Sequence, residues 1–188
     1  MRRRIMATCA AGAAALIGCG GGSMHTEHAS GSAAGSRAAP AERTQGASAP
    51  SFARDTARLR VATAAFRSME GAAAAGYPIT PVPGCIAHPT LGGMGHHLTN
   101  EKLLDATIEV ERPEVLVYRR TPGGGYELTG VEYMVPFSAH PPEKSPPTVM
   151  GQELKPFARG KFWYRHVWIW LDNPAGLFED WNPKVACT

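Results

Sequence analysis

The sequence predicts an α+β fold, in which one N-terminal amphipathic helix packs on a small, mainly antiparallel sheet with long ordered loops. A helical pattern of apolar residues occurs at residues 51–75. Two later strand-like segments are separated by a run of glycines, which is typical of an antiparallel hairpin. A third such segment begins at Phe162 and, with the residues that follow it, carries all four tryptophans. Large aromatic side chains dominate core packing, so we expect this end to build the core.

The predicted helix is indicated by apolar side chains at three- and four-residue steps, a spacing that places them on one helical face. Gly76 follows as a C-cap, and Pro78 prevents continuation of the helix. The stripe consists of Leu59, Ala62, Phe66, Met69 and Ala73. We expect this helix to dock on the sheet in a structural role.

Beyond the helix, residues 77–95 are rich in proline and glycine and are predicted to be mainly loop. Residues 114–120 and 126–135 are predicted strands that pair as a hairpin across the glycine turn at 123–125. Residues 162–171 form the third predicted strand.

The N-terminus has the order of a secretory signal peptide. Three arginines follow Met1, and residues 5–18 are mostly small and apolar, without an acidic residue. The sequence LIGC at 16–19 then matches a lipobox, where bacterial lipoprotein precursors are cut before a cysteine that receives acyl chains such as palmitate. The predicted organisation is a signal peptide at 1–18, a flexible Gly/Ala/Ser tether at 19–50 that begins with the lipidated Cys19, and a single α+β domain at 51–188.

These features predict an exported protein that is anchored to the bacterial cell envelope by its N-terminal lipid. Gly20 stands where aspartate would favour retention in the inner membrane, so the outer membrane is preferred in a host with two membranes. Removal of the signal peptide takes three of the 19 basic residues and leaves 16 against 16 acidic ones. The mature chain is therefore near neutral and lacks the basic footprint of a nucleic-acid-binding protein.

The cysteines predict one disulfide bond. Cys9 is lost with the signal peptide and Cys19 carries the lipid, so Cys85 and Cys187 remain as a pair in an oxidising compartment such as the periplasm. Their bond would close a loop of about a hundred residues and contribute on the order of 4 kcal/mol in the chain-entropy model. A metal or redox site is the alternative, but no CxxC spacing supports it.

Two ionisable residues fall on largely apolar strand faces, because alternate residues of a strand share a face. Glu132 is predicted to share its side with Tyr126, Leu128 and Met134. His166 is predicted to share its side with Phe162, Tyr164, Trp168 and Trp170. Burial of either group without a partner is costly, so we expect the two to meet, directly or through a metal ion.

Two further histidines complete the predicted cluster: His97 in the glycine-rich segment, and His88 in the loop that the disulfide would hold near the aromatic strand. Imidazole and carboxylate ligands suit zinc, copper, iron or manganese better than magnesium or calcium. No closely spaced ligand motif is present, and two structural alternatives stay open. Glu132 could pair with Arg165 across strands, and His166 could be satisfied within the core.

Four motifs resemble those of a group of uncharacterised exported bacterial proteins. The motifs are MGxHxxN at 94–100, PExLxY at 113–118, VEYxVP at 131–136 and HVWxWxxNPxGxF at 166–178. The resemblance covers residues 71–187 and brings no activity with it. It implies that His97, Glu132 and His166 belong to the family pattern, whereas His96 and His140 do not.

The sequence therefore predicts a lipid-anchored extracytoplasmic protein with a transition-metal or small-ligand site, and it leaves open whether the protein is an enzyme. Its membrane contact is the N-terminal lipid. The alternative function is a non-catalytic envelope protein that binds a protein partner or a ligand through aromatic surface and loops such as residues 137–155.

Overall fold

The computed structural model describes residues 48–187. The predicted signal peptide, the predicted lipidation site at Cys19 and the predicted tether up to residue 47 lie outside the described residues. Among the residues that are described, no helix has the length and apolar character needed to cross a membrane.

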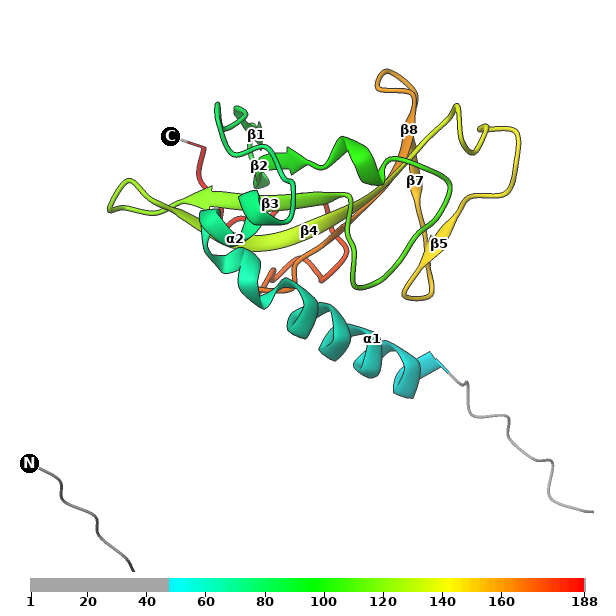
Figure 1. Cartoon of the computed structure of the whole chain (residues 1–188), viewed down its shortest axis with the longest axis horizontal. Helices are drawn as coiled ribbons and strands as arrows, with labels where there is room; N and C mark the ends of the chain where they lie inside the picture. The colour runs from blue at the N-terminus through cyan, green and yellow to red at the C-terminus, as the bar shows by residue number, and fades with distance from the viewer. Residues whose placement is uncertain (1–47, 188) are drawn as a thin grey trace, which may run out of the picture. The chain divides into compact units, whose positions relative to one another are not determined.

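The helical part of the chain consists of three segments, α1 (Ser48–Thr63), the 3-10 helix η1 (Ala64–Arg67) and α2 (Met69–Ala74) (Figure 1). The break before α2 falls at Ser68, whose backbone is extended. Its hydroxyl accepts a hydrogen bond from Gly71 N at 3.0 Å and so caps α2. The helix predicted over 51–75 is therefore interrupted, because a serine in an N-cap conformation starts a new helix.

Six strands form one antiparallel sheet in the order β1-β2-β3-β4-β8-β7, and β5 and β6 form a separate short hairpin. The predicted hairpin is confirmed as β3 and β4, and the third predicted strand is β8, which pairs with β4. A short 3-10 helix, η2 (Glu101–Leu103), follows β2. The strand bounds are β1 Cys85–His88, β2 Gly92–Thr99, β3 Val115–Arg120, β4 Tyr126–Pro136, β5 Thr148–Val149, β6 Gln152–Glu153, β7 Lys155–Phe157 and β8 Phe162–Val167.

Strands β1 and β2 occupy much of the segment that was predicted to be mainly loop. Glycines weaken a strand on their own, but here they let another part of the chain come close. A Cβ on Gly92 would lie 2.2 Å from the Asn182 carbonyl oxygen, and one on Gly93 would lie 2.9 Å from Val185 Cγ1. Gly93 and Asn182 also form an antiparallel bridge. The glycines therefore seat the C-terminal segment on β2.

The two faces of the sheet have different coverings. On one face, Tyr118 and Tyr133 pack in the main apolar cluster with Leu59 of α1, and the Tyr118 hydroxyl donates to the Phe66 carbonyl of η1. The helices thus cover this face, which we call the helix face. The C-terminal segment contacts the opposite face, where Trp168 stacks on His166 with ring centroids 4.3 Å apart.

The predicted disulfide bond between Cys85 and Cys187 is confirmed, with the two Cα atoms 5.4 Å apart. It joins the start of β1 to the end of the chain and so fixes the C-terminal segment at both β1 and β2. A disulfide is compatible with an extracytoplasmic location.

Candidate metal site

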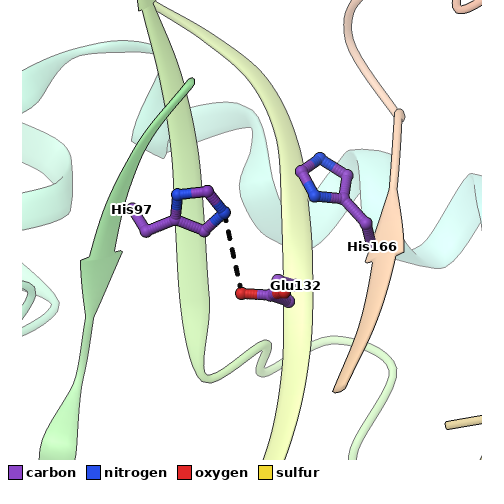
Figure 2. Close-up of side chains that lie close together, drawn as sticks. All are labelled: His97, Glu132 and His166. Atoms are coloured by element: carbon purple, nitrogen blue, oxygen red, sulfur yellow. Dashed lines mark ion pairs between the residues drawn. The ribbon is translucent and has the colours of Figure 1, made fainter. Parts of the chain in front are cut away.

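Three ionisable side chains meet on the sheet face opposite the helix face. His97 lies on β2, Glu132 on β4 and His166 on β8. Glu132 and His166 are directly opposite each other in the β4–β8 ladder, so their side chains share a face. His97 belongs to the same face, because it is opposite Val117, which pairs with Gly130 two residues before Glu132. Figure 2 shows the two imidazole rings on either side of the carboxyl group.

The separations suit ligands of a single metal ion. One candidate ligand atom from each of the three residues lies within 4.8 Å of the other two. His97 Nε2 is 3.7 Å from Glu132 Oε2, and the two imidazole rings are nearly perpendicular, with centroids 6.0 Å apart. Metal–ligand bonds of about 2.1 Å place two ligands of one ion up to about 4.2 Å apart. In tetrahedral coordination the separation is about 3.4 Å, so side-chain shifts on the order of 1 Å would bring the three ligand atoms within reach of one ion.

A β-bulge sets which side chains share the face with Glu132. Val117 of β3 is opposite Gly130 of β4, but the next residue, Tyr118, is opposite Leu128. Thr129 is therefore an extra residue on β4 without a partner in the ladder. Leu128 consequently lies on the helix face, as Tyr118 does. Tyr126, two residues before Leu128, lies on the same face. The prediction that Tyr126 and Leu128 share a side with Glu132 is wrong for this reason, whereas Met134 does line a cavity together with Glu132.

Strand β8 is shorter than predicted, and this changes the position of Trp170. The strand ends at Val167, after which the backbone N–H groups of Trp170 and Leu171 both donate to the Thr129 carbonyl at 3.0 Å. The Trp170 indole N–H donates to the Thr63 hydroxyl of α1, also at 3.0 Å. Trp170 thus contacts the helix, and the prediction that it shares a face with His166 is wrong, whereas Trp168 does stack on His166.

The site is largely buried, and three of its four imidazole nitrogens lack hydrogen bonds among the described residues. His166 is fully buried and Glu132 is 4% exposed. Within the described part of the chain, no group hydrogen-bonds to either nitrogen of His166 or to Nδ1 of His97. Each buried polar atom left unbonded costs about 1–3 kcal/mol, so the fold tolerates this arrangement only if something compensates.

Burial sets the charge of all three groups in the absence of a cation. Burial lowers the pKa of His97 to about 4. The backbone of Gly95 offsets part of this lowering of the pKa, although its contact with His97 lacks the geometry of a regular hydrogen bond. Burial and the neighbouring His97 hold the pKa of His166 well below its usual value. Burial, with a contribution from Asp180, raises the pKa of Glu132 to about 8. At neutral pH the His97–Glu132 contact is thus not an ion pair, and both imidazoles are in the neutral form that metals bind.

The fourth predicted ligand, His88, is not brought to the cluster. Its Nδ1 accepts hydrogen bonds from the backbone N–H groups of Thr90 and Leu91 at 3.2 Å, and its ring packs against Trp181. It stabilises the turn between β1 and β2. Arg165 likewise does not pair with Glu132, since its guanidinium donates to the Glu153 carbonyl.

A cavity of about 290 Å³ opens beside the cluster and is lined by both His97 and Glu132. Alternation along β8 predicted that Phe162 and Tyr164 lie on this face of the sheet. No local pattern in the sequence indicated the other residues that line the cavity and come from segments far apart in the chain. These residues are Ile86, Met94, Phe157, Asp180 and Trp181.

Comparisons of the chain with known protein families, with curated proteins and with solved structures found no match. The resemblance of the motifs to exported bacterial proteins therefore stays a prediction.

Proposed function

We propose that this protein is a lipid-anchored extracytoplasmic protein that binds one transition-metal ion through His97, Glu132 and His166. The observation that carries this proposal is the convergence of three largely buried ligand side chains, in which both nitrogens of His166 and Nδ1 of His97 have no hydrogen bond of regular geometry among the described residues. The lipobox at 16–19 and the compatibility of the Cys85–Cys187 bond with an oxidising compartment support the location.

The donor set selects the kind of ion. Two imidazoles and one carboxylate suit zinc, iron, manganese or copper, whereas magnesium and calcium prefer oxygen ligands. A cation also reverses the effect of burial on Glu132, because it stabilises the carboxylate that burial disfavours. One ion would thus compensate for both the unbonded imidazole nitrogens and the buried carboxyl group.

Three protein ligands leave at least one coordination position for water or a small molecule. Because His97 and Glu132 line the cavity, that position faces it. A metal ion with an open coordination position would act as a Lewis acid on a bound molecule or lower the pKa of a bound water molecule. This open position distinguishes the proposed site from a structural metal site, in which four protein ligands enclose the ion.

Metal content tests the proposal directly. The full chain, purified without a polyhistidine tag, is stripped with chelator, reloaded separately with zinc, manganese, iron(II) and copper, and desalted before elemental analysis. We expect about one ion per chain for at least one metal, and substoichiometric metal in His166→Gln, His97→Gln and Glu132→Gln, since each removes one ligand. Titration with the same metal should show at least about a tenfold loss of affinity in each variant.

His140→Ala and His88→Ala are matched controls, because both histidines lie outside the cluster and bond to backbone groups. They should retain the metal content of the natural protein. Circular dichroism of each metal-free variant separates loss of a ligand from loss of the fold. Substoichiometric metal in the folded natural protein, or full metal content in His166→Gln, would reject the proposal and favour the alternative of a non-catalytic partner-binding protein.

A further inference from the structure

The cavity beside the cluster has a composition that identifies the kind of molecule it accepts. We propose that it binds a small aromatic compound whose single metal-coordinating group reaches the ion held by His97, Glu132 and His166. This proposal rests on the metal site proposed above and adds the class of ligand.

Four of the ten residues that line the cavity are Phe, Tyr or Trp, and most of its surface is apolar. Phe157, Phe162, Tyr164 and Trp181 line it, and Met94 and Met134 also contribute to its surface. The ring centroids of Phe157 and Phe162 lie 5.2 Å apart, and those of Phe162 and Tyr164 lie 6.3 Å apart with nearly perpendicular planes. Rings at these angles present both faces and edges to an inserted aromatic ring, and methionine sulfur also contacts ring edges favourably.

Two polar side chains of the cavity outside the cluster, Tyr164 and Asp180, already have partners. The Tyr164 hydroxyl donates to Asp180 Oδ2 at 3.1 Å, and Lys155 Nζ donates to Asp180 Oδ1 at 3.0 Å. The carboxylate of Asp180 is thus paired with a cation and a hydroxyl. Of the ionisable groups that line the cavity, His97 and Glu132 are the ones that remain to direct a polar atom of a ligand. A ligand with one polar end and an apolar body matches this distribution.

Two of the cavity residues are unusually exposed for their type. Ile86 is 46% exposed and Phe157 is 44% exposed, and both border the cavity. Exposed apolar side chains beside a cavity are typical of a ligand-binding surface. The cavity volume of about 290 Å³ corresponds to about ten water-sized groups. A single substituted ring is of this size.

A series of hydroxamates tests the proposal on the full chain loaded with cobalt(II), whose visible spectrum reports coordination of the hydroxamate. Benzohydroxamate carries a ring, acetohydroxamate has the same head group without the ring, and hexanohydroxamate replaces the ring with an alkyl chain. Burial of the ring should make benzohydroxamate bind roughly 10- to 100-fold more tightly than acetohydroxamate. It should also bind at least about threefold more tightly than hexanohydroxamate, since the walls are aromatic.

Phe157→Ala should weaken benzohydroxamate binding by about fivefold, because it removes part of one wall at the entrance. It should leave cobalt content and acetohydroxamate binding unchanged. Val61→Ala is the matched control, because Val61 is an exposed apolar residue on α1 outside the cavity, and it should change none of these values. Equal affinity for the three hydroxamates on cobalt-loaded protein, or an unchanged affinity in Phe157→Ala, would overturn this inference alone. Failure of the natural protein to bind any metal would overturn both proposals.

Discussion

Glu132 and Glu114 are both carboxyl groups buried in this fold, and their surroundings differ. Glu132 lies between two imidazoles on the same face of the sheet. Glu114 lies just before β3, and its Oε2 accepts a hydrogen bond from Met134 N at 3.0 Å. Burial raises the pKa of Glu114 to about 7, although the Met134 N–H favours the charged form and opposes the shift. Within the described residues Glu114 belongs to no metal-ligand cluster, so its effect on stability can be measured separately.

Glu114 should make the folded protein less stable as the pH rises. The unfolded chain releases the Glu114 proton near pH 4.5, but the folded protein keeps it to about pH 7. The folded state therefore binds more protons between these values, and the free energy of unfolding falls with increasing pH across this window, by on the order of 3 kcal/mol from this residue. Denaturant unfolding of Glu114→Gln at pH 5, 6, 7 and 8 should show a weaker fall than the natural protein. Glu109→Gln, an exposed control, should not. Parallel pH profiles for natural protein and Glu114→Gln would contradict this explanation.

Sequence reasoning identified His97, Glu132 and His166 because each is polar among apolar or glycine neighbours on a predicted strand or in a glycine-rich segment. It included His88 only through its proximity to a disulfide cysteine, which is a weaker constraint than strand alternation. A cysteine near a histidine fixes where the backbone runs, but not where the imidazole points. In the structure the His88 ring turns to its own backbone.

At the scale of elements, β4 is central to the site because it carries Glu132 and pairs with both β3 and β8. Gly130 of this strand lies close to β8. A Cβ at Gly130 would be 2.7 Å from the Val167 carbonyl oxygen and 3.3 Å from His166 Nε2. The glycine thus allows the close approach that places the His166 ring beside Glu132.

Gly130→Ala should displace β8 and reduce the free energy of unfolding by about 1–3 kcal/mol, since the new methyl group meets backbone atoms. It should also weaken metal binding, because His166 moves with β8. Thermal unfolding and metal titration measure the two effects. Gly123→Ala is the matched control, because a methyl group added there, in the β3–β4 turn, would have no atom of the described residues within 4 Å. Full stability and metal affinity in Gly130→Ala would show that the close packing is unimportant.

The elements that local pattern predicted best were the β3–β4 hairpin and β8, where alternation and a glycine turn act over short distances. Pattern failed at β2, because Gly92, Gly93 and Gly95 lower strand propensity and their role depends on contact with the C-terminal segment. It also missed the bulge at Thr129, which reverses the faces of the residues before it. Such features arise from tertiary contacts that a local window does not contain.

At the scale of the whole molecule, the Cys85–Cys187 bond joins residues separated by 102 positions and holds the C-terminal segment near the site. The two cysteines that remain after the predicted loss of Cys9 and lipidation of Cys19 were sufficient to predict this bond, and the helical and strand-like patterns predicted the α+β class. The contents of the cavity were not predictable, because its walls come from β1, β2, β4, β7, β8 and the C-terminal segment. Convergence of so many segments follows only from the complete fold.

Removal of the disulfide in Cys85→Ser/Cys187→Ser should lower the free energy of unfolding by about 4–5 kcal/mol, since the unfolded chain regains the entropy of a loop of roughly one hundred residues. Denaturant unfolding measures this change. Reduction of the natural protein should reproduce the loss, and the same reductant should leave the double variant unchanged. Equal stability of the oxidised natural protein and the double variant would contradict a stabilising role for the bond.

We propose that one ion binds between β2, β4 and β8. Anomalous diffraction from crystals of metal-loaded protein, recorded on either side of the absorption edge of the metal, locates the ion without assumption. We predict a single peak within about 2.3 Å of one nitrogen of His97, one nitrogen of His166 and one carboxylate oxygen of Glu132. A peak at His88, His96 or His140 with none at this cluster, or no peak in crystals of stoichiometrically loaded protein, would contradict the claim.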